Sequence, residues 1–228
     1  MTAPANKATP RPAASGPRRL LLRPNLAIGG AMILVLVAIA LLSLVWTPLP
    51  PAKMQIIHKL KPPLAYGLLG TDQFGRDLAS MLMVGAWNSL STAAVAVTLG
   101  GAAGTALGVL AAARRGPTEA IVMRANDVIF AVPPILSAMM LGALIGSGRF
   151  TAIIAIAVFM VPVFARVTAS AARQIWARDY VLAARGAGKG PLLITLEHVL
   201  PNISPQIIVQ ATIQLGLAIL TEAGLSFL

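Results

Sequence analysis

Residues 178–202 read RDYVLAARGAGKGPLLITLEHVLPN, a short basic stretch that separates two long apolar runs. The charged residues make this stretch too costly for hydrocarbon, whereas each flanking run is apolar enough to cross a bilayer. Residues 179–187 are rich in alanine and favour a helix, and the glycines around Gly188 supply the freedom for a bend. Pro191 favours the start of a second helix. The stretch therefore predicts a hairpin of two short helices outside the membrane.

The second arm of this predicted hairpin carries apolar residues at spacings of three and four, which would place them on one helix face. The arm is expected to end at Pro201, and Arg185 and Lys189 are expected near the tip. The residues assigned to the apolar face are Leu192, Leu193, Leu196, Val199 and Leu200.

The composition is that of a membrane protein. Hydrophobic residues make up 57% of the 228 residues and charged residues only 11%, with a mean hydropathy of +0.81; soluble domains carry about 25% charged residues. The apolar stretches are continuous and do not alternate, which favours helices over a barrel. We therefore predict an all-α, polytopic helical membrane protein, in which the net charge of +11 reflects topology and not nucleic-acid binding.

The apolar runs predict five spans, at about residues 26–46, 89–113, 128–146, 151–166 and 203–221. Residues 1–25 are predicted to form a disordered, basic cytoplasmic tail, residues 26–228 a transmembrane domain, and residues 167–202 a cytoplasmic loop. The fourth run reaches Arg166 early, so we expect either a short helix or an arginine that extends to the interface. Ser204-Pro205 is the expected start of the fifth span.

Positive charge is distributed unequally across this topology. With the N-terminus inside, the outer segments hold Lys53, Lys59, Lys61, Arg76 and Arg149, and the remaining Lys and Arg residues lie on inner segments. Because inner loops of membrane proteins carry the excess of Lys and Arg, this bias predicts a cytoplasmic N-terminus and a cytoplasmic loop at 167–202.

The outer segment between the first two spans contains GTDQFGRD at residues 70–77. Two aspartates around a glycine invite a calcium site, but the alternating ligands and closing glutamate of an EF-hand loop are missing from the string. We expect turn and cap chemistry instead, with a turn starting at Thr71-Asp72 and Asp77 capping the next helix. The motif residues singled out are Gly70, Thr71, Asp72, Gly75, Arg76 and Asp77.

Three features inside the spans are informative. Gly100, Gly104 and Gly108 repeat every four residues and predict close packing of a neighbouring helix. The pair Pro133-Pro134 breaks the third span and is a weak marker of a transport pathway. Arg124 and Asp127, three residues apart on a helix, are expected to pair at the membrane edge.

Glu222 is the one carboxylate in or beside a span in the C-terminal part of the chain. It either marks the outer interface or faces a partner or the mouth of a pathway, where it would contact substrate or close an outer gate.

Two motifs carry a resemblance to a known family. The hairpin resembles the cytoplasmic EAA loop of bacterial ABC-importer permeases at Ala183, Ala184, Gly188, Leu200 and Pro201, and Leu182 stands where that family has its glutamate. Tyr180, His198 and Asn202 are similar to the peptide-importer branch. By this resemblance the loop would dock into a groove of an ATPase subunit. The residues expected to make this contact also include Arg185.

The string at residues 70–77 resembles a segment of the C-type permease of dipeptide and oligopeptide importers, and Glu222-Ala223 followed by LSFL at 225–228 resembles another. The resemblance implies a type I ABC importer transmembrane domain in the bacterial inner membrane, with five of six spans visible and the chain truncated. It implies a second permease in a heterodimer, two ATPase subunits that bind ATP and magnesium, a periplasmic or lipid-anchored substrate-binding protein, and a peptide substrate.

Other functions are less consistent with these residues. The sequence contains no phosphate-binding G-x-x-x-x-G-K-[ST], and His58 and His198 are predicted on opposite sides of the membrane, so we expect no catalytic site, metal or cofactor on this chain. Importers of nickel, opines or glutathione share the same motifs and stay open as alternatives. A secondary transporter or channel would need an ionisable relay in mid-span, and the spans are nearly free of charge.

Overall fold

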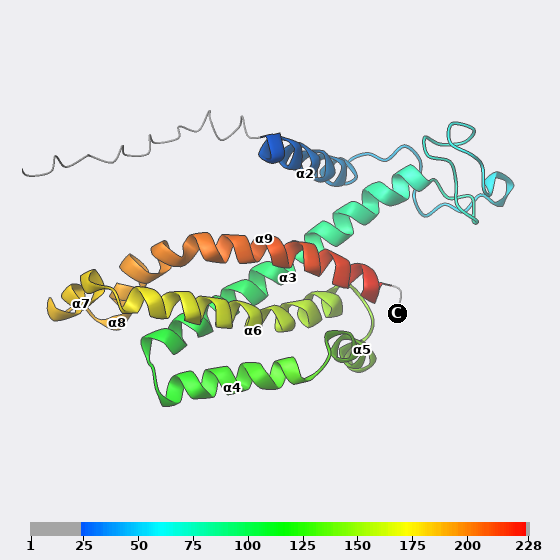
Figure 1. Ribbon diagram of the computed structural model, residues 1–228. Helices are drawn as coiled ribbons and strands as arrows, with labels where there is room; N and C mark the ends of the chain where they lie inside the picture. Colours follow the sequence, from blue (N-terminus) through cyan, green and yellow to red (C-terminus); the bar gives the residue numbers. More distant parts are fainter. Residues whose placement is uncertain (1–23, 227–228) are drawn as a thin grey trace, which may run out of the picture. The chain divides into compact units, whose positions relative to one another are not determined.

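The structure is a computed structural model that describes residues 24–226. The predicted tail, apart from Pro24 and Asn25, and the last two residues of the LSFL string lie outside this range. The regular secondary structure of the described residues is helical, with one isolated bridge between Thr71 and Asp77, and the predicted all-α class is confirmed. In order, the elements are α2 (Pro24–Leu42), the 3-10 turn η1 (Ile56–His58), α3 (Leu78–Ala113), α4 (Pro117–Ala131), α5 (Pro134–Ile145), α6 (Arg149–Trp176), α7 (Asp179–Gly186), α8 (Pro191–Ile194), the π-helical η2 (Thr195–Val199) and α9 (Leu200–Leu225), as Figure 1 shows.

Four helices within the described residues are long and apolar enough to cross a membrane: α2, α3, α6 and the run Pro191–Leu225. A fifth crossing exists if α4 and α5 are counted as one bent span. Several helix ends differ from the predicted spans. Helix α3 begins at Leu78 and not near residue 89, and α6 continues through residues 167–176 to Trp176.

The predicted third span is not a single helix. Residues 128–131 end α4, residues 134–145 form α5, and the two helices meet at a bend of 83°. Pro133 precedes α5 with an extended ψ of 135°, because a proline pair removes backbone donors and disfavours helix in the preceding residue. With 12 residues, α5 is about 18 Å long, too short to cross about 30 Å of hydrocarbon alone.

The chain divides into two compact units, whose boundary in the sequence falls between Trp87 and Asn88, within α3. In the first unit, α2 exposes nearly all of its apolar side chains, as a helix that meets lipid or other subunits would. A compact segment of turns, residues 49–80, connects α2 to α3 and is called the outer module below. The second unit contains the rest of α3 and helices α4 to α9.

Helix α6 is central to the second unit. It packs against α4, α5 and α9, and its buried side chains join those of α3 and α9 in a core around Phe164, Met160 and Ile156. The three glycines of α3 explain how close α3 can come. A β-carbon at Gly100, Gly104 or Gly108 would lie 2.3–2.5 Å from a backbone carbonyl oxygen of α6. These oxygens belong to Ala157, Val161 and Ala165, which also repeat every four residues, so the two backbones meet along matched rows.

Ion pairs connect α6 to α4. Arg166 pairs with Asp127 and Arg173 with Glu119. The expected pairing of Arg124 with Asp127 is therefore wrong. The carboxylate instead meets an arginine of α6, whose guanidinium also lies 4.8 Å from the ring centre of Phe130. These partners satisfy the arginines along α6 and explain why the helix does not stop at Arg166.

Candidate functional site

The hairpin at residues 178–202 lies at one end of the second unit, where α7 and α8 sit side by side (Figure 1). Helix α7 is anchored by Val181, which is fully buried with Trp176 and Val109. Gly188 forms the bend with a φ of +83°, and its amide donates to the Arg185 carbonyl at 3.0 Å. A left-handed φ of this kind suits glycine because it has no β-carbon. The predicted helix–bend–helix order is thus present.

The second arm of the hairpin turns a different face inward from the one predicted. Ile194, Thr195 and Val199 are buried, whereas Leu192, Leu193 and Leu196 are 74%, 44% and 55% exposed. The prediction that Leu192, Leu193, Leu196, Val199 and Leu200 share one face is therefore wrong, since only Val199 and Leu200 turn toward the core. Residues 195–199 form a π-helix, which changes the phase between the residues before and after it relative to a 3.6-residue period.

Pro201 does not end the hairpin, and Ser204-Pro205 does not start the last span. The helix is continuous from Pro191 to Leu225. Pro201 is the second residue of α9 and lies directly after the π-helical segment, inside the continuous helix. Pro205 cannot donate to the Pro201 carbonyl four residues earlier, and the Ser204 hydroxyl donates to that oxygen instead, at 2.9 Å. The exposed loop and the last apolar helix are therefore one rigid element.

The predicted coupling residues do not all face outward. Tyr180 is 46% exposed and meets the ring of His198 edge-on, with 6.0 Å between ring centres. Ala183 is exposed, and a β-carbon at Gly188 would meet no atom within 4 Å. Ala184, in contrast, packs against the buried cluster.

The remaining members of the set lie around this surface. Arg185 is exposed with its guanidinium 5.2 Å from the Trp176 ring centre, Lys189 pairs with Glu197, Leu200 packs in part against the core, and Pro201 is exposed.

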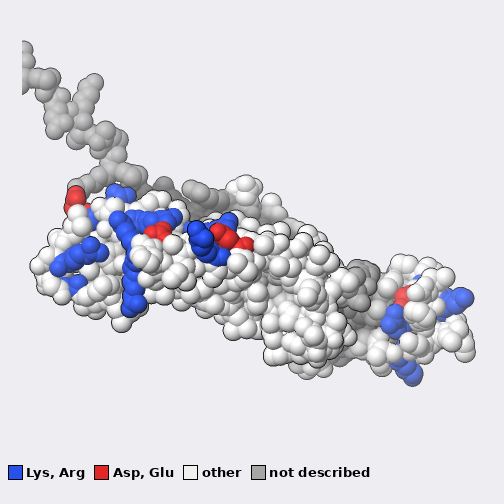
Figure 2. All heavy atoms as spheres, turned by 90° about the horizontal axis from the view of Figure 1, so that it is seen from below, with Lys and Arg blue, Asp and Glu red and all other residues white. Residues whose placement is uncertain are grey.

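Basic side chains gather at this end of the second unit, as Figure 2 shows. Arg114 and Arg115 at the end of α3 are exposed, as are Arg178 and Arg185. Leu182, at the position of the family's glutamate, is 52% exposed and lines a hollow of about 430 Å³ together with both α3 arginines and Arg185. A carboxylate of a partner would find several cations here.

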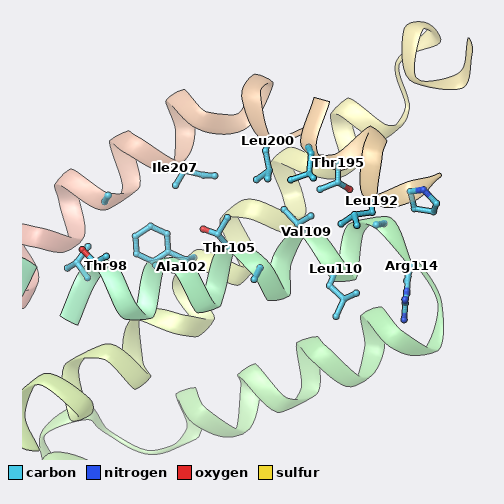
Figure 3. A pocket seen from close by; sticks show the side chains of 18 residues that line it. Thr98, Ala102, Thr105, Val109, Leu110, Arg114, Leu192, Thr195, Leu200 and Ile207 are labelled. Atoms are coloured by element: carbon cyan, nitrogen blue, oxygen red, sulfur yellow. The ribbon is translucent and has the colours of Figure 1, made fainter. Parts of the chain in front are cut away.

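A larger groove of about 980 Å³ lies between α3 and the Pro191–Leu225 helix, and sequence reasoning missed it. Figure 3 shows α3 side chains on one wall, ending at Arg114, and side chains of α8, η2 and α9 on the other. The exposed Leu192 and Leu196 belong to the second wall. The predominance of glycine and alanine along α3 between Gly101 and Ala113 was the available signal. The labelled lining residues are Thr98, Ala102, Thr105, Val109, Leu110, Arg114, Leu192, Thr195, Leu200 and Ile207.

Glu222 lies near the other end of the second unit and is bound to α3. The Ser89 hydroxyl donates to its Oε2 at 2.6 Å, across 133 positions of sequence. On the same turns of α3, Arg149 at the start of α6 donates to the hydroxyls of Ser91 and Thr92. Glu222 is therefore a half-buried contact between helices. Pro133 is exposed at the α4–α5 bend, and the Pro134 side chain lies outside what the structure describes.

The motif at residues 70–77 organises the outer module. The Asp72 carboxylate accepts from the amides of Phe74 and Arg76 at 2.9 Å and from the Arg76 guanidinium. Desolvation raises its pKa, but these hydrogen bonds and the arginine charge outweigh it and hold the pKa of Asp72 below its usual value. Asp77 is buried and accepts from the amide and hydroxyl of Ser80, so it caps α3 as predicted. The predicted turn at Asp72 is closed by the Gly75 amide.

Among the described residues no group of three His, Asp or Glu side chains is placed to hold a metal ion. A bundle of apolar helices, with a basic hairpin continuous with its last helix, defines the class as a multi-span membrane protein.

The comparisons with known proteins give the family. Residues 104–228 match the family described as "Binding-protein-dependent transport system inner membrane component". The di/tripeptide transport system permease protein DppC of Pseudomonas aeruginosa is 37% identical over 209 residues, covering 89% of this chain and 69% of that protein. The probable D,D-dipeptide transport system permease protein DdpC of Escherichia coli is 33% identical over 204 residues, covering 89% and 68%. The glutathione transport system permease protein GsiD of Pectobacterium atrosepticum is 34% identical over 212 residues, covering 92% and 70%.

The chain belongs to this family of binding-protein-dependent transport system inner membrane components. It is a permease subunit of an ABC importer and not an enzyme, as the family and the relatives named as permease proteins indicate.

Proposed function

We propose that this permease moves di- or oligopeptides across the bacterial inner membrane and that the α7–α8 hairpin receives the motion of an ATPase subunit on the cytoplasmic side. The observation that carries the proposal is the continuous helix Pro191–Leu225. A displacement of the hairpin must move this helix as a rigid rod, because no break separates the exposed arm from the apolar part. ATP binding outside the membrane thereby changes helix packing inside it.

The orientation follows from charge. The hairpin end of the second unit carries Arg114, Arg115, Arg178, Arg185 and Lys189, and the opposite end carries Arg149 as its single cation among the described residues. Cytoplasmic segments hold the excess of Lys and Arg, so the hairpin faces the cytoplasm. The N-terminus of α2 then lies on the same side, and the outer module faces the periplasm or cell exterior.

The docking surface consists of the hairpin residues that face outward. Tyr180, Leu182 and Ala183 of α7 and the exposed Leu192 and Leu193 of the second arm present apolar area, and Arg185 presents charge. Apolar residues in the centre of a contact, with cations at its rim, suit a protein groove with acidic edges. Because Leu182 replaces a carboxylate, this contact is apolar where the family forms a charged one.

The substrate class rests on the relatives. Two of the three relatives above are named for di- or tripeptides and one for glutathione, itself a small peptide. A peptide importer with two different permease subunits, two ATPases and a substrate-binding protein is the assembly we propose. Glutathione is the second candidate substrate because of the third relative.

An exposed alanine on the hairpin provides the test. Ala184 packs inward and Gly188 has a left-handed φ, so large replacements at these two positions would act on the fold as well as on docking. We expect Ala183→Trp, in the complete importer in proteoliposomes, to lower ATP-dependent peptide uptake at least tenfold while the permease still inserts, because the indole blocks the ATPase groove.

The matched control is Ala120→Trp, an exposed alanine on α4, which should leave uptake unchanged. Equal uptake by the Ala183→Trp variant and the parent would remove the docking role from the hairpin.

A further inference from the structure

The outer module is built to hold one short segment, residues 55–64, in a fixed shape. The motif at 70–77 contacts the backbone of this segment. Gly75 lies so close to Gln55 that a β-carbon would be 1.8 Å from the Gln55 carbonyl oxygen, and one at Gly70 would be 2.3 Å from the Lys61 carbonyl oxygen. Both glycines have positive φ, 73° and 80°, so both positions require glycine. The glycines of the string therefore hold a neighbouring segment of the same chain.

Hydrogen bonds complete the clamp on this segment. The Thr71 hydroxyl donates to the His58 carbonyl and accepts from the Lys61 amide at 2.9 Å. The Leu60 amide donates to the Asp72 carbonyl at 3.0 Å. His58 also stacks on Tyr66 with 3.9 Å between ring centres, and the Tyr66 hydroxyl reaches Gln55 at 2.6 Å. Residues 55–64 are therefore fixed from several directions.

The clamp holds two leucines in a conformation that leucine rarely adopts. Leu60 and Leu64 have φ of 53° and 68°, in the left-handed region, and their side chains are 67% and 83% exposed. A bulky residue in this region is strained, and such strain persists where the surrounding structure enforces it, most often at functional sites. Neither leucine gains burial in return. The contacts of the outer module therefore hold a backbone from which two apolar side chains are exposed.

Charge identifies the kind of partner. Lys53, Lys59 and Lys61 are exposed on the module and have no carboxylate partner within the described residues, since Asp72 pairs with Arg76 and Asp77 is buried at the α3 cap. Two rigid apolar side chains flanked by unpaired lysines are complementary to an apolar pocket with an acidic rim.

We propose that Leu60 and Leu64, with Lys59 and Lys61 beside them, form a preorganised docking site for an acidic surface of the importer's substrate-binding protein. This inference rests on the proposed function, which places the module outside the membrane, and on the family, which depends on a binding protein. The clamped backbone lowers the cost of ordering this segment on binding, because the backbone that carries the two leucines is already held in the free permease.

The experiment measures the Kd between the assembled importer in nanodiscs and its fluorescently labelled substrate-binding protein, at low and at physiological salt. Leu60→Gly/Leu64→Gly should weaken binding at least tenfold, while the thermal stability of the importer stays the same or rises, because glycine relieves the left-handed strain. Loss of binding with gain of stability is a combination that a merely structural role does not produce. Lys59→Glu/Lys61→Glu should weaken binding and flatten its salt dependence.

Gln73→Ala, an exposed neutral change in the same module, is the matched control and should bind like the parent. Unchanged Kd for the glycine double variant overturns the proposal. A loss of binding that occurs in phosphatidylglycerol nanodiscs and disappears in phosphatidylcholine also overturns it, because the module would then anchor in lipid. The Kd measurement does not involve transport, so it stays valid even if the proposed peptide substrate is wrong. If the docking site is wrong instead, the proposed peptide transport is still tested separately by the uptake assay.

Discussion

Replacing Gly104 by alanine tests the close packing of α3 on α6. The new β-carbon would lie 2.3 Å from the Val161 carbonyl oxygen and 2.7 Å from the Phe164 β-carbon, whereas ordinary contacts begin near 3.4 Å. The new β-carbon belongs to the backbone of α3 and meets the backbone of α6, so neither group can rotate away and the two helices must separate by about 1 Å. Overpacking of this kind lowers the free energy of unfolding by about 1–3 kcal/mol. In an isolated helix, alanine in place of glycine would stabilise the helix by about 0.8–1 kcal/mol. A loss of stability in Gly104→Ala therefore identifies overpacking against α6, and a gain identifies helix propensity alone.

Thermal or denaturant unfolding of the purified permease in detergent measures this effect. Gly216→Ala on α9 is the matched control, because a β-carbon there meets nothing within 4 Å, and it should be neutral or stabilising by up to about 1 kcal/mol. Gly104→Leu should lower stability further than Gly104→Ala. If Gly104→Ala stabilised the permease as much as Gly216→Ala did, α3 and α6 would not be in the close contact described above.

Three smaller perturbations test other contacts. The pKa of Asp72 is lowered in the folded protein, so the stability that its carboxylate contributes is complete above the ordinary carboxyl pKa of 3.8 and is lost as pH falls through the folded pKa. Thermal melts of the importer below pH 4 should therefore show the outer module loosening. The Asp72→Asn variant should lose this pH dependence. The pair Arg173–Glu119 is partly exposed, so a double-mutant cycle with glutamines should give a coupling of about 0.2–1 kcal/mol that declines with salt; a salt-independent coupling would contradict a solvent-exposed pair. Glu222→Leu removes the acceptor of the Ser89 hydroxyl and should cost about 1–2 kcal/mol in unfolding, whereas Glu222→Gln keeps an acceptor and should be near neutral; equal stability of both variants would show that the contact does not bind α9 to α3.

The sequence predicted the elements that depend on local chemistry. Continuous apolar runs identified helices, Gly188 identified the bend, and Asp77 identified the cap of α3, because each depends on neighbours within a few residues. The spacing of Gly100, Gly104 and Gly108 correctly pointed to a close helix contact, although the partner helix could not be named. A row of glycines indicates that another helix packs closely, but it does not indicate which helix.

The features that sequence reasoning missed depend on long-range contacts. Whether Asp127 pairs with Arg124 or Arg166 depends on where α6 lies, and no local pattern holds that information. The π-helix at 195–199 changed which leucines are buried, and its residues have no distinctive propensity. Pro201 and Pro205 suggested a break before the last span, yet Pro201 lies just after the π-helical segment of a continuous helix. The Ser204 hydroxyl donates to the Pro201 carbonyl, to which Pro205 cannot donate.

Part of the candidate site was expected from the resemblance to the EAA loop. Tyr180, Ala183 and Arg185 were expected at a docking surface and are exposed on α7, while Ala184 faces the core because the helix period places it beside Val181 and not beside Ala183. The left-handed Leu60 and Leu64 had no signal in the sequence, since leucine gives no indication of positive φ.

Thiol cross-linking from Ala183 tests most directly whether the hairpin is the contact between permease and ATPase. The chain contains no cysteine, so Ala183→Cys introduces a single reactive thiol on this subunit. In the assembled importer, a short bis-maleimide should join this position to an ATPase subunit, with a yield that changes when ATP is added, and Ser147→Cys at the opposite end should give no such product. A cross-link from Ser147→Cys to the ATPase, with none from Ala183→Cys, would contradict both the orientation and the coupling role of the hairpin.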